Sequence, residues 1–272
     1  MTATGVIASG SSIQLATTVH GAIKRRLAVS RSNPEPRART PYPNVHVVDI
    51  PEFTPEALSG LSSVASRIDL PCIGDIDISP ARGEALRKAA PGVDVWSLLT
   101  KALTATGVRG AAEEAYRSDL DDTLDFMHTW GARFHSDAHH WVESLFWVLV
   151  LHAPEVELVL PQAGICVPLM AGRLVVFDPV LGHGLRRIGD KVACAEESFR
   201  GTASARQTFL AGELQLNDDD WCALGSPWVS ESSDAVLGAT DLGLARYDPH
   251  TGAILNARAA KLKAAEPANS PA

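Results

Sequence analysis

Residues 146–188 read FWVLVLHAPEVELVLPQAGICVPLMAGRLVVFDPVLGHGLRRI, and this stretch decides the fold class. Short apolar or alternating runs are separated by turn residues such as Pro154, Gly164 and Gly172. Runs of this kind, broken by turn signals every 8 to 12 residues or so, are typical of antiparallel sandwiches and barrels. The stretch therefore predicts a domain of many short strands.

Helical patterns come before this strand-rich region. VHVVDIP at residues 45–51 indicates a strand, and TPEALSGLSSVASRI follows it with Thr54 as a helix N-cap and Pro55 as the first helical residue. Two more helices are expected, from Ser79 (SPARGEALRKAA) and from Val93 (VDVWSLLTKALTATG). RQTFLAGELQL, residues 206–216, predicts one further strand. The expected fold is α+β and mainly β: a double-stranded β-helix, or jelly roll, with the N-terminal helices packed on one side.

Composition shifts suggest three regions. Residues 30–44, SRSNPEPRARTPYPN, are rich in Pro, Arg and Ser, which is typical of a linker. We expect residues 1–44 to be a weakly structured N-terminal segment and linker, and residues 45–216 to be the jelly-roll domain. Residues 217–272 are expected to form a C-terminal extension, whose Ala- and Pro-rich tail frays.

Charge and cysteine usage exclude several classes of protein. The formal net charge is -8 and no long Lys/Arg stripe is present, so a nucleic-acid partner is not expected. The four cysteines are widely spaced without a CxxC pair, which favours free thiols in a reducing compartment. The N-terminus lacks the pattern of a signal peptide, and the longest apolar run, Leu145–Leu151, is too short to span a bilayer. We expect a cytoplasmic protein without a membrane partner.

The segment RFHSDAHHW places His135 and Asp137 two residues apart. If this segment is a strand, alternation points both side chains to one face, where they can share an ion. His183 lies several strands onward, just after the Pro-containing turn of FDPVLGHG. Two imidazoles and one carboxylate on neighbouring strands are the ligand set of non-haem Fe(II) sites that keep open positions. The pattern predicts that His135, Asp137 and His183 bind iron.

Two other interpretations of these histidines stay open. His135 and Asp137 would also suit a surface hydrogen-bonding pair, with His183 a simple turn residue. In an unbroken strand His139 would share the face of His135 and Asp137, so that HSDAH becomes a local ligand cluster. The HxHxDH order of metallo-hydrolases of the β-lactamase type does not match.

The motif resembles that of the Fe(II)/2-oxoglutarate-dependent dioxygenases, in particular prolyl-hydroxylase-like bacterial members, in which an HxD motif precedes a distal His. The similarity runs from about Leu124 to Leu216 and is best over AGRLVVFDPVLGHGL. VHVVDIPEFTPEALSGL is similar to the strand and helix that open such enzymes. The resemblance implies that His135, Asp137 and His183 hold Fe(II), that 2-oxoglutarate is the co-substrate, and that a small-molecule or peptidyl substrate is hydroxylated.

The chain departs from that family at the basic residue that pairs with the far carboxylate of 2-oxoglutarate. The family places this residue shortly after the distal His on the next strand, where this chain has Ala193. Lys191 and Arg206 are the candidates, and we favour Arg206 because it opens the stretch similar to the family's final strand. Arg186 and Arg187 are closer but lie in the strand of the distal His.

Two other functions remain compatible with these residues. One is a jelly-roll binding or sensor module that has lost productive chemistry, which the irregular basic anchor favours. The other is a cupin-type metalloenzyme that binds a metal but does not use 2-oxoglutarate. Cupins generally carry a GxHxH-type motif, which is not found in this sequence.

Overall fold

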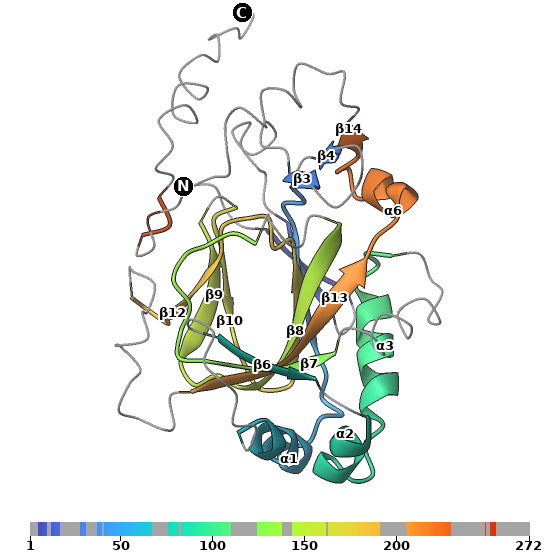
Figure 1. Cartoon of the computed structure of the whole chain (residues 1–272), viewed down its shortest axis with the longest axis vertical. Coiled ribbons are helices and arrows are strands. Elements are labelled where there is room, and N and C mark those ends of the chain that lie inside the picture. Colours follow the sequence, from blue (N-terminus) through green and yellow to red (C-terminus); the bar gives the residue numbers. More distant parts are fainter. Residues whose placement is uncertain are drawn as a thin grey trace, which may run out of the picture.

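The computed structural model describes the following residues: 5–9, 12–16, 28–30, 37–39, 41–66, 76–80, 83–109, 124–137, 143–161, 163–190, 206–229, 248 and 251–253. Its main body is a pair of facing antiparallel sheets with helices on one outer side (Figure 1). None of the helices in these ranges is long and apolar enough to cross a bilayer.

The larger sheet has eight strands in the order β1-β2-β5-β11-β8-β13-β7-β6. Their bounds are β1 Gly5–Ser9, β2 Ser12–Ala16, β5 Val45–Asp49, β6 Ile76–Pro80, β7 Asp125–Thr129, β8 Ser144–His152, β11 Arg173–Phe177 and β13 Gln207–Gln215. The smaller sheet has the order β10-β9-β12, with β9 Val156–Leu160, β10 Ile165–Pro168 and β12 Gly184–Arg187. A third sheet joins β14 (Trp228–Val229), β4 (Arg37–Arg39) and β3 (Ala28–Ser30).

The path of the chain between the sheets makes this a jelly roll. From β7 in the larger sheet it passes to residues 132–137, which join β12 of the smaller sheet through a bridge between His135 and His183. It returns to β8, crosses to β9 and β10, and returns to β11. It then crosses to β12 and ends in β13, which pairs with both β7 and β8. The prediction of a mainly β jelly roll is confirmed.

Four helices accompany these sheets within the described residues: α1 Pro55–Ser66, α2 Gly83–Ala89, α3 Val95–Ala105 and α6 Asp218–Ala223. Thr54 Oγ1 accepts a hydrogen bond from the backbone N–H of Ala57 at 3.3 Å, as expected of an N-cap. The helix expected from Ser79 is wrong at its start, because Ser79 and Pro80 end strand β6 and the helix begins at Gly83. Strand β6 lies at the edge of the sheet, where a proline is tolerated.

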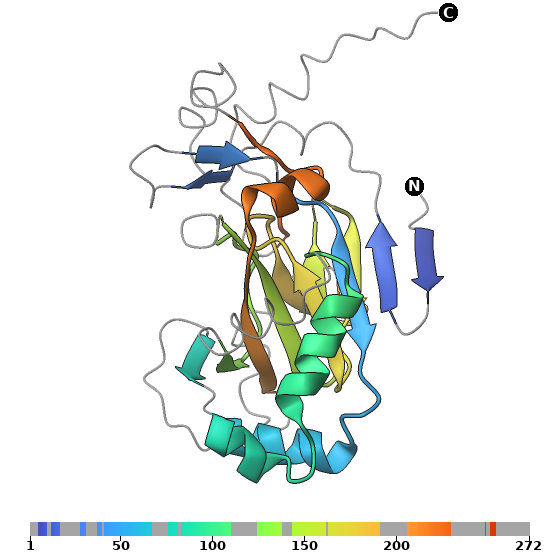
Figure 2. The same cartoon turned by 90° about the vertical axis from the view of Figure 1, so that its right-hand side faces the viewer.

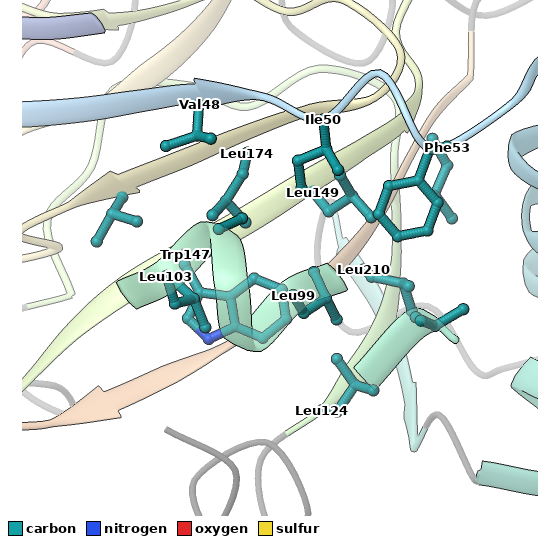
Figure 3. Close-up of a cluster of buried hydrophobic side chains, with 14 of the residues drawn as sticks. Val48, Ile50, Phe53, Leu99, Leu103, Leu124, Trp147, Leu149, Leu174 and Leu210 are labelled. Carbon is teal, nitrogen blue, oxygen red and sulfur yellow. The ribbon is translucent and has the colours of Figure 1, made fainter. Parts of the chain in front are cut away.

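The main hydrophobic core lies between the larger sheet and helices α1 to α3 (Figures 1 and 2). Trp147 and Leu149 on β8 point from the sheet toward Leu99 and Leu103 of α3 (Figure 3). Alternate β8 residues, among them Val148, face the other way into a second apolar cluster between the two sheets. Both faces of β8 are therefore buried, in agreement with the apolar run FWVLVLH, and the inner faces of the two sheets are left to form the site. The proposed division at residues 44 and 216 stays a prediction.

Gly60 lets α1 and α2 pack closely. A Cβ at position 60 would lie 1.8 Å from the carbonyl oxygen of Ala89, a backbone atom that cannot rotate away. We expect Gly60→Ala to lower the free energy of unfolding by about 1–3 kcal/mol, because overpacking outweighs the helix propensity gained. Urea denaturation tests this against Ser63→Ala, an exposed position on the same helix. Equal stabilisation by both substitutions would contradict the expectation.

His46 on β5 is buried, and its Nε2 lies 2.8 Å from the hydroxyl of Tyr42. Burial lowers the pKa of this imidazole to about 4. Below pH 6.5 the unfolded chain binds a proton that the folded protein does not, so stability is lost as the pH falls from 6.5 toward 4. The loss attributable to His46 is up to about 3 kcal/mol.

Unfolding in urea at pH 7 and pH 4.5 tests this pH dependence in His46→Gln and in wild-type protein. The variant should lose less stability between the two pH values, because its side chain does not titrate. His152→Gln is the control, since His152 at the end of β8 is exposed. Wild-type and His46→Gln proteins with the same pH dependence would rule out this role for His46.

Candidate metal centre

The structure brings together the three side chains that the sequence singled out as metal ligands. His135, Asp137 and His183 each offer one ligand atom, and these atoms all lie within 4.8 Å of one another. His135 Nε2 lies 3.6 Å from Asp137 Oδ1, and His183 Nε2 lies 3.4 Å from Asp137 Oδ2. Ligands bonded to one metal at about 2.1 Å and at right angles lie about 3 Å apart. The three groups therefore need only a small adjustment to share an ion.

Both imidazoles are oriented by a backbone carbonyl on the side away from Asp137. His135 Nδ1 donates to the Arg133 oxygen at 2.6 Å, and His183 Nδ1 donates to the Leu181 oxygen at 2.8 Å. A carbonyl oxygen only accepts hydrogen bonds, so each Nδ1 carries the proton and each Nε2 is left for another partner. This is the usual way in which proteins fix the tautomer and ring orientation of a metal-binding histidine.

A positive charge between the two Nε2 atoms and the Asp137 carboxylate would stabilise this arrangement. Burial lowers the pKa of the His183 imidazole, but the hydrogen bond and charge of Asp137, with smaller contributions from Leu181 and Asp178, raise it above its ordinary value. The positive charge that Asp137 favours can be supplied by a proton or by a metal ion. The residues thus fit an Fe(II) ion as a two-histidine, one-carboxylate set.

Local backbone pairing holds the ligands in place although their segment is not a regular strand. The expected strand around His135 is a single bridge: His135 N donates to His183 O at 3.0 Å and His183 N donates to His135 O at 2.9 Å. Asp137 N donates to Pro179 O at 2.9 Å, and the Ser136 hydroxyl donates to Val180 O at 2.7 Å. The two halves of the site are therefore tied by main-chain bonds.

A buried ion pair supports the turn that carries His183. Asp178 accepts hydrogen bonds from both terminal nitrogens of Arg39, at 2.6 and 3.1 Å, and neither side chain is exposed. The same carboxylate accepts from the backbone N–H groups of Tyr42 and Val180. The Arg39 guanidinium also stacks on Trp221, 3.7 Å from its ring centroid. No sequence pattern assigned a role to Arg39 or Asp178, although Asp178 belongs to the FDPVLGHG stretch.

Of the two expected co-substrate anchors, only Arg206 belongs to the described residues. Arg206 precedes β13, and its guanidinium carbon lies 6.0 Å from the Trp130 ring centroid. Arg186 on β12 pairs with Glu157 at 2.5 Å, and Arg187 is exposed. Lys191 and His139 lie outside the described residues. The roles of Arg206 and Lys191 stay predictions.

No family model and no curated protein matches the chain. Among solved structures it is similar to a collagen prolyl hydroxylase from Paramecium Bursaria Chlorella virus-1 (13% identity, TM-score 0.39, covering 64% of this chain and 96% of that one). It is also similar to a prolyl-4-hydroxylase from Pseudomonas putida (16%, 0.38, 64% and 92%). A third is a 2OG-Fe(II) oxygenase family oxidoreductase from Burkholderia pseudomallei (14%, 0.35, 61% and 82%).

Proposed function

We propose that the protein is an Fe(II)-dependent oxygenase whose metal is held by His135, Asp137 and His183. The observation that carries the proposal is the convergence of two oriented Nε2 atoms on the two oxygens of one carboxylate. A facial set of three ligands leaves positions for a bidentate co-substrate and for O₂. Bound there, Fe(II) would supply the oxidising chemistry that amino-acid side chains lack.

The contribution of the chain itself is to bind, orient and exclude water. His183 is nearly buried, whereas the side chains of His135 and Asp137 are 37% and 32% exposed. The ligands therefore lie where solvent meets the cavity between the sheets, and a substrate can approach from the exposed side. The Phe177 and His183 rings pack edge to face with their centroids 5.0 Å apart, and Phe177 shields the imidazole from water.

The resemblance makes 2-oxoglutarate the expected co-substrate and a small molecule or a protein side chain the expected substrate. Both stay proposals. 2-Oxoglutarate would need a cation at its far carboxylate, for which Arg206 and Lys191 are the candidates. The alternative of a non-catalytic jelly-roll module predicts a protein that purifies without stoichiometric metal.

Anaerobic titration with Fe(II) tests the proposal. We expect one iron per chain and, on adding a 2-oxo acid, a weak visible charge-transfer band. Admitting O₂ with ascorbate as reductant should then convert the 2-oxo acid to the carboxylic acid one carbon shorter, with release of CO₂ and reduction of the second oxygen atom to water. His152→Ala is a control, because His152 is exposed and lies outside the set of three ligands. Protein that binds no iron would contradict the proposal and favour the non-catalytic module.

A further inference from the structure

A cavity of about 270 Å³ extends from the three ligands into the space between the two sheets. His135, Asp137 and His183 form part of its wall, and the rest is mainly apolar. Its largest apolar side chains are Met127, Phe146, Phe177 and Phe209, with Leu158, Leu169 and Leu185 beside them. A ligand that reaches the metal site from within the protein must therefore place most of its surface against hydrocarbon.

The polar side chains of the described wall, apart from the metal ligands, are acidic or uncharged, so none of them forms an ion pair with a second carboxylate. Apart from the three ligands, they are Asp125, Thr129 and Glu213. Glu213 accepts hydrogen bonds from Ser144 and Gln215, each at 3.1 Å. No lysine or arginine is among the described residues that line the cavity.

Strand β13, which follows the strand of the distal histidine, lines the cavity where a basic anchor was expected. Its side chains on the cavity side are Phe209, Ala211 and Glu213. Phe209 lies opposite Met127 of strand β7, and Met127 also lines the cavity. Thr208 and Leu210 alternate with the cavity-side residues of β13 and face the helix side, where Leu210 belongs to the core. Arg206 precedes the strand, and it is not among the described residues that line the cavity.

The cost of removing a ligand from water lets this cavity wall discriminate between charged and apolar tails. Burying a carboxylate without a cation is strongly unfavourable, and two nearby carboxylates make it more so. For an uncharged hydrocarbon tail in the same space, each buried CH₂ group strengthens binding by about fourfold. The described wall therefore disagrees with 2-oxoglutarate, a dicarboxylate, and agrees with a monocarboxylate whose tail is apolar.

We propose that the site takes a 2-oxo acid with an apolar, uncharged tail, branched or aromatic, in preference to 2-oxoglutarate. The inference rests on the proposed function for the metal that the oxo acid chelates. The size and lining of the cavity then determine the tail, and Phe209 is the specificity-determining residue on β13.

Calorimetry on the Co(II)-loaded protein tests this preference without turnover. We expect 4-methyl-2-oxopentanoate and phenylpyruvate to bind at least about tenfold more tightly than 2-oxoglutarate. Lys191→Ala and Arg206→Ala should leave weak 2-oxoglutarate binding unchanged. Equal affinities, or tight 2-oxoglutarate binding that either variant abolishes, would overturn the inference.

Phe209→Arg should reverse the preference, because it places a cation on the cavity wall. If this variant does not fold, the wild-type affinities decide the matter.

A second measurement, methionine methyl NMR, tests ligand binding in the cavity independently of metal binding. Among the three methionines of the chain, Met127 lines the cavity and Met170 is 56% exposed. In protein labelled at its methionine methyl groups, phenylpyruvate should shift the NMR signal of Met127 but not that of Met170. The phenyl ring can enter the cavity without metal. A protein that binds no iron but shows the Met127 shift would therefore count against the proposed function alone. Absence of a Met127 shift with phenylpyruvate, or a shift with 2-oxoglutarate instead, would count against the apolar ligand.

Discussion

Asp137→Ala is expected to weaken Fe(II) binding by at least about a hundredfold, which exceeds the effect of losing a group that only supports a ligand. Asp137 is the one carboxylate among the three ligands, and both Nε2 atoms face its oxygens. Without it the two imidazoles, with ring centroids 4.4 Å apart, have no negative charge between them to balance a divalent ion. The folded structure should persist, because the Asp137 side chain is partly exposed.

Two measurements check this expectation. Metal analysis after dialysis gives the iron retained per chain, and thermal unfolding with and without metal gives the linked stabilisation. A metal present at a hundred times its Kd stabilises the folded protein by about 2.7 kcal/mol, and Asp137→Ala should lose that increment. Asp49→Ala, which removes an exposed carboxylate on β5, is the charge-matched control. Wild-type metal affinity in Asp137→Ala would mean that the metal lies elsewhere.

The same measurements distinguish the local HSDAH cluster from the ligand set proposed for the metal. His183→Ala should remove metal binding, and His139→Ala should leave it intact. The opposite result would favour the local cluster. The bridge between His135 and His183 supports the first outcome, because it ties the distal histidine to the HxD segment by two backbone hydrogen bonds.

The parts of the fold that follow from local pattern could be predicted from the sequence. Strands β8 and β11 are apolar over most of their length because both of their faces pack on a core, whereas buried and exposed residues alternate along β10. Turns separate these strands. The three ligands could be proposed because two histidines and one carboxylate are rare at this spacing in a strand-rich region, although the structure holds His135 and His183 in an isolated bridge outside the regular strands. At Ser79 and Pro80 the local pattern was misleading: a serine before a proline favours a helix start, but pairing with β7 holds them in a strand.

Long-range contacts leave no comparable pattern. Arg39 and Asp178 are 139 residues apart, and Arg39 lies in a Pro- and Arg-rich stretch whose composition indicates a linker. An arginine in such a stretch is ordinarily solvated, so nothing in its neighbours indicates complete burial. The absence of a basic residue from the described cavity wall also depends on which residues of β13 face inward, which the sequence around 206–216 does not fix.

Arg39→Ala is expected to lower the free energy of unfolding by about 3–5 kcal/mol, a large fraction of the total for a domain. The change leaves the Asp178 carboxylate buried without its cation, because both side chains are fully inaccessible to solvent. It also removes the stacking partner of Trp221 on α6. Chemical denaturation measures the loss.

A second bidentate pair in the same protein provides the control. Arg173 donates to both oxygens of Asp49 at 2.7 and 2.9 Å, but there the carboxylate side chain is 52% exposed. Arg173→Ala should cost no more than about 1 kcal/mol, because water replaces the lost partner. Similar losses in the two variants would show that burial does not determine the strength of the Arg39–Asp178 pair.

The effect of Arg39 should extend to the metal site, because Asp178 also binds the backbone of the turn that leads to His183. Val180 N donates to Asp178 Oδ1 at 3.1 Å, and the Val180 carbonyl accepts from Ser136, the residue between His135 and Asp137. A turn that loses this support holds the ligands less firmly, so we expect Arg39→Ala to weaken metal binding by about tenfold or more. Arg173→Ala should not change it. A folded Arg39→Ala protein with wild-type metal affinity would limit Arg39 to stability, because the positions of the ligands would then not depend on the buried ion pair.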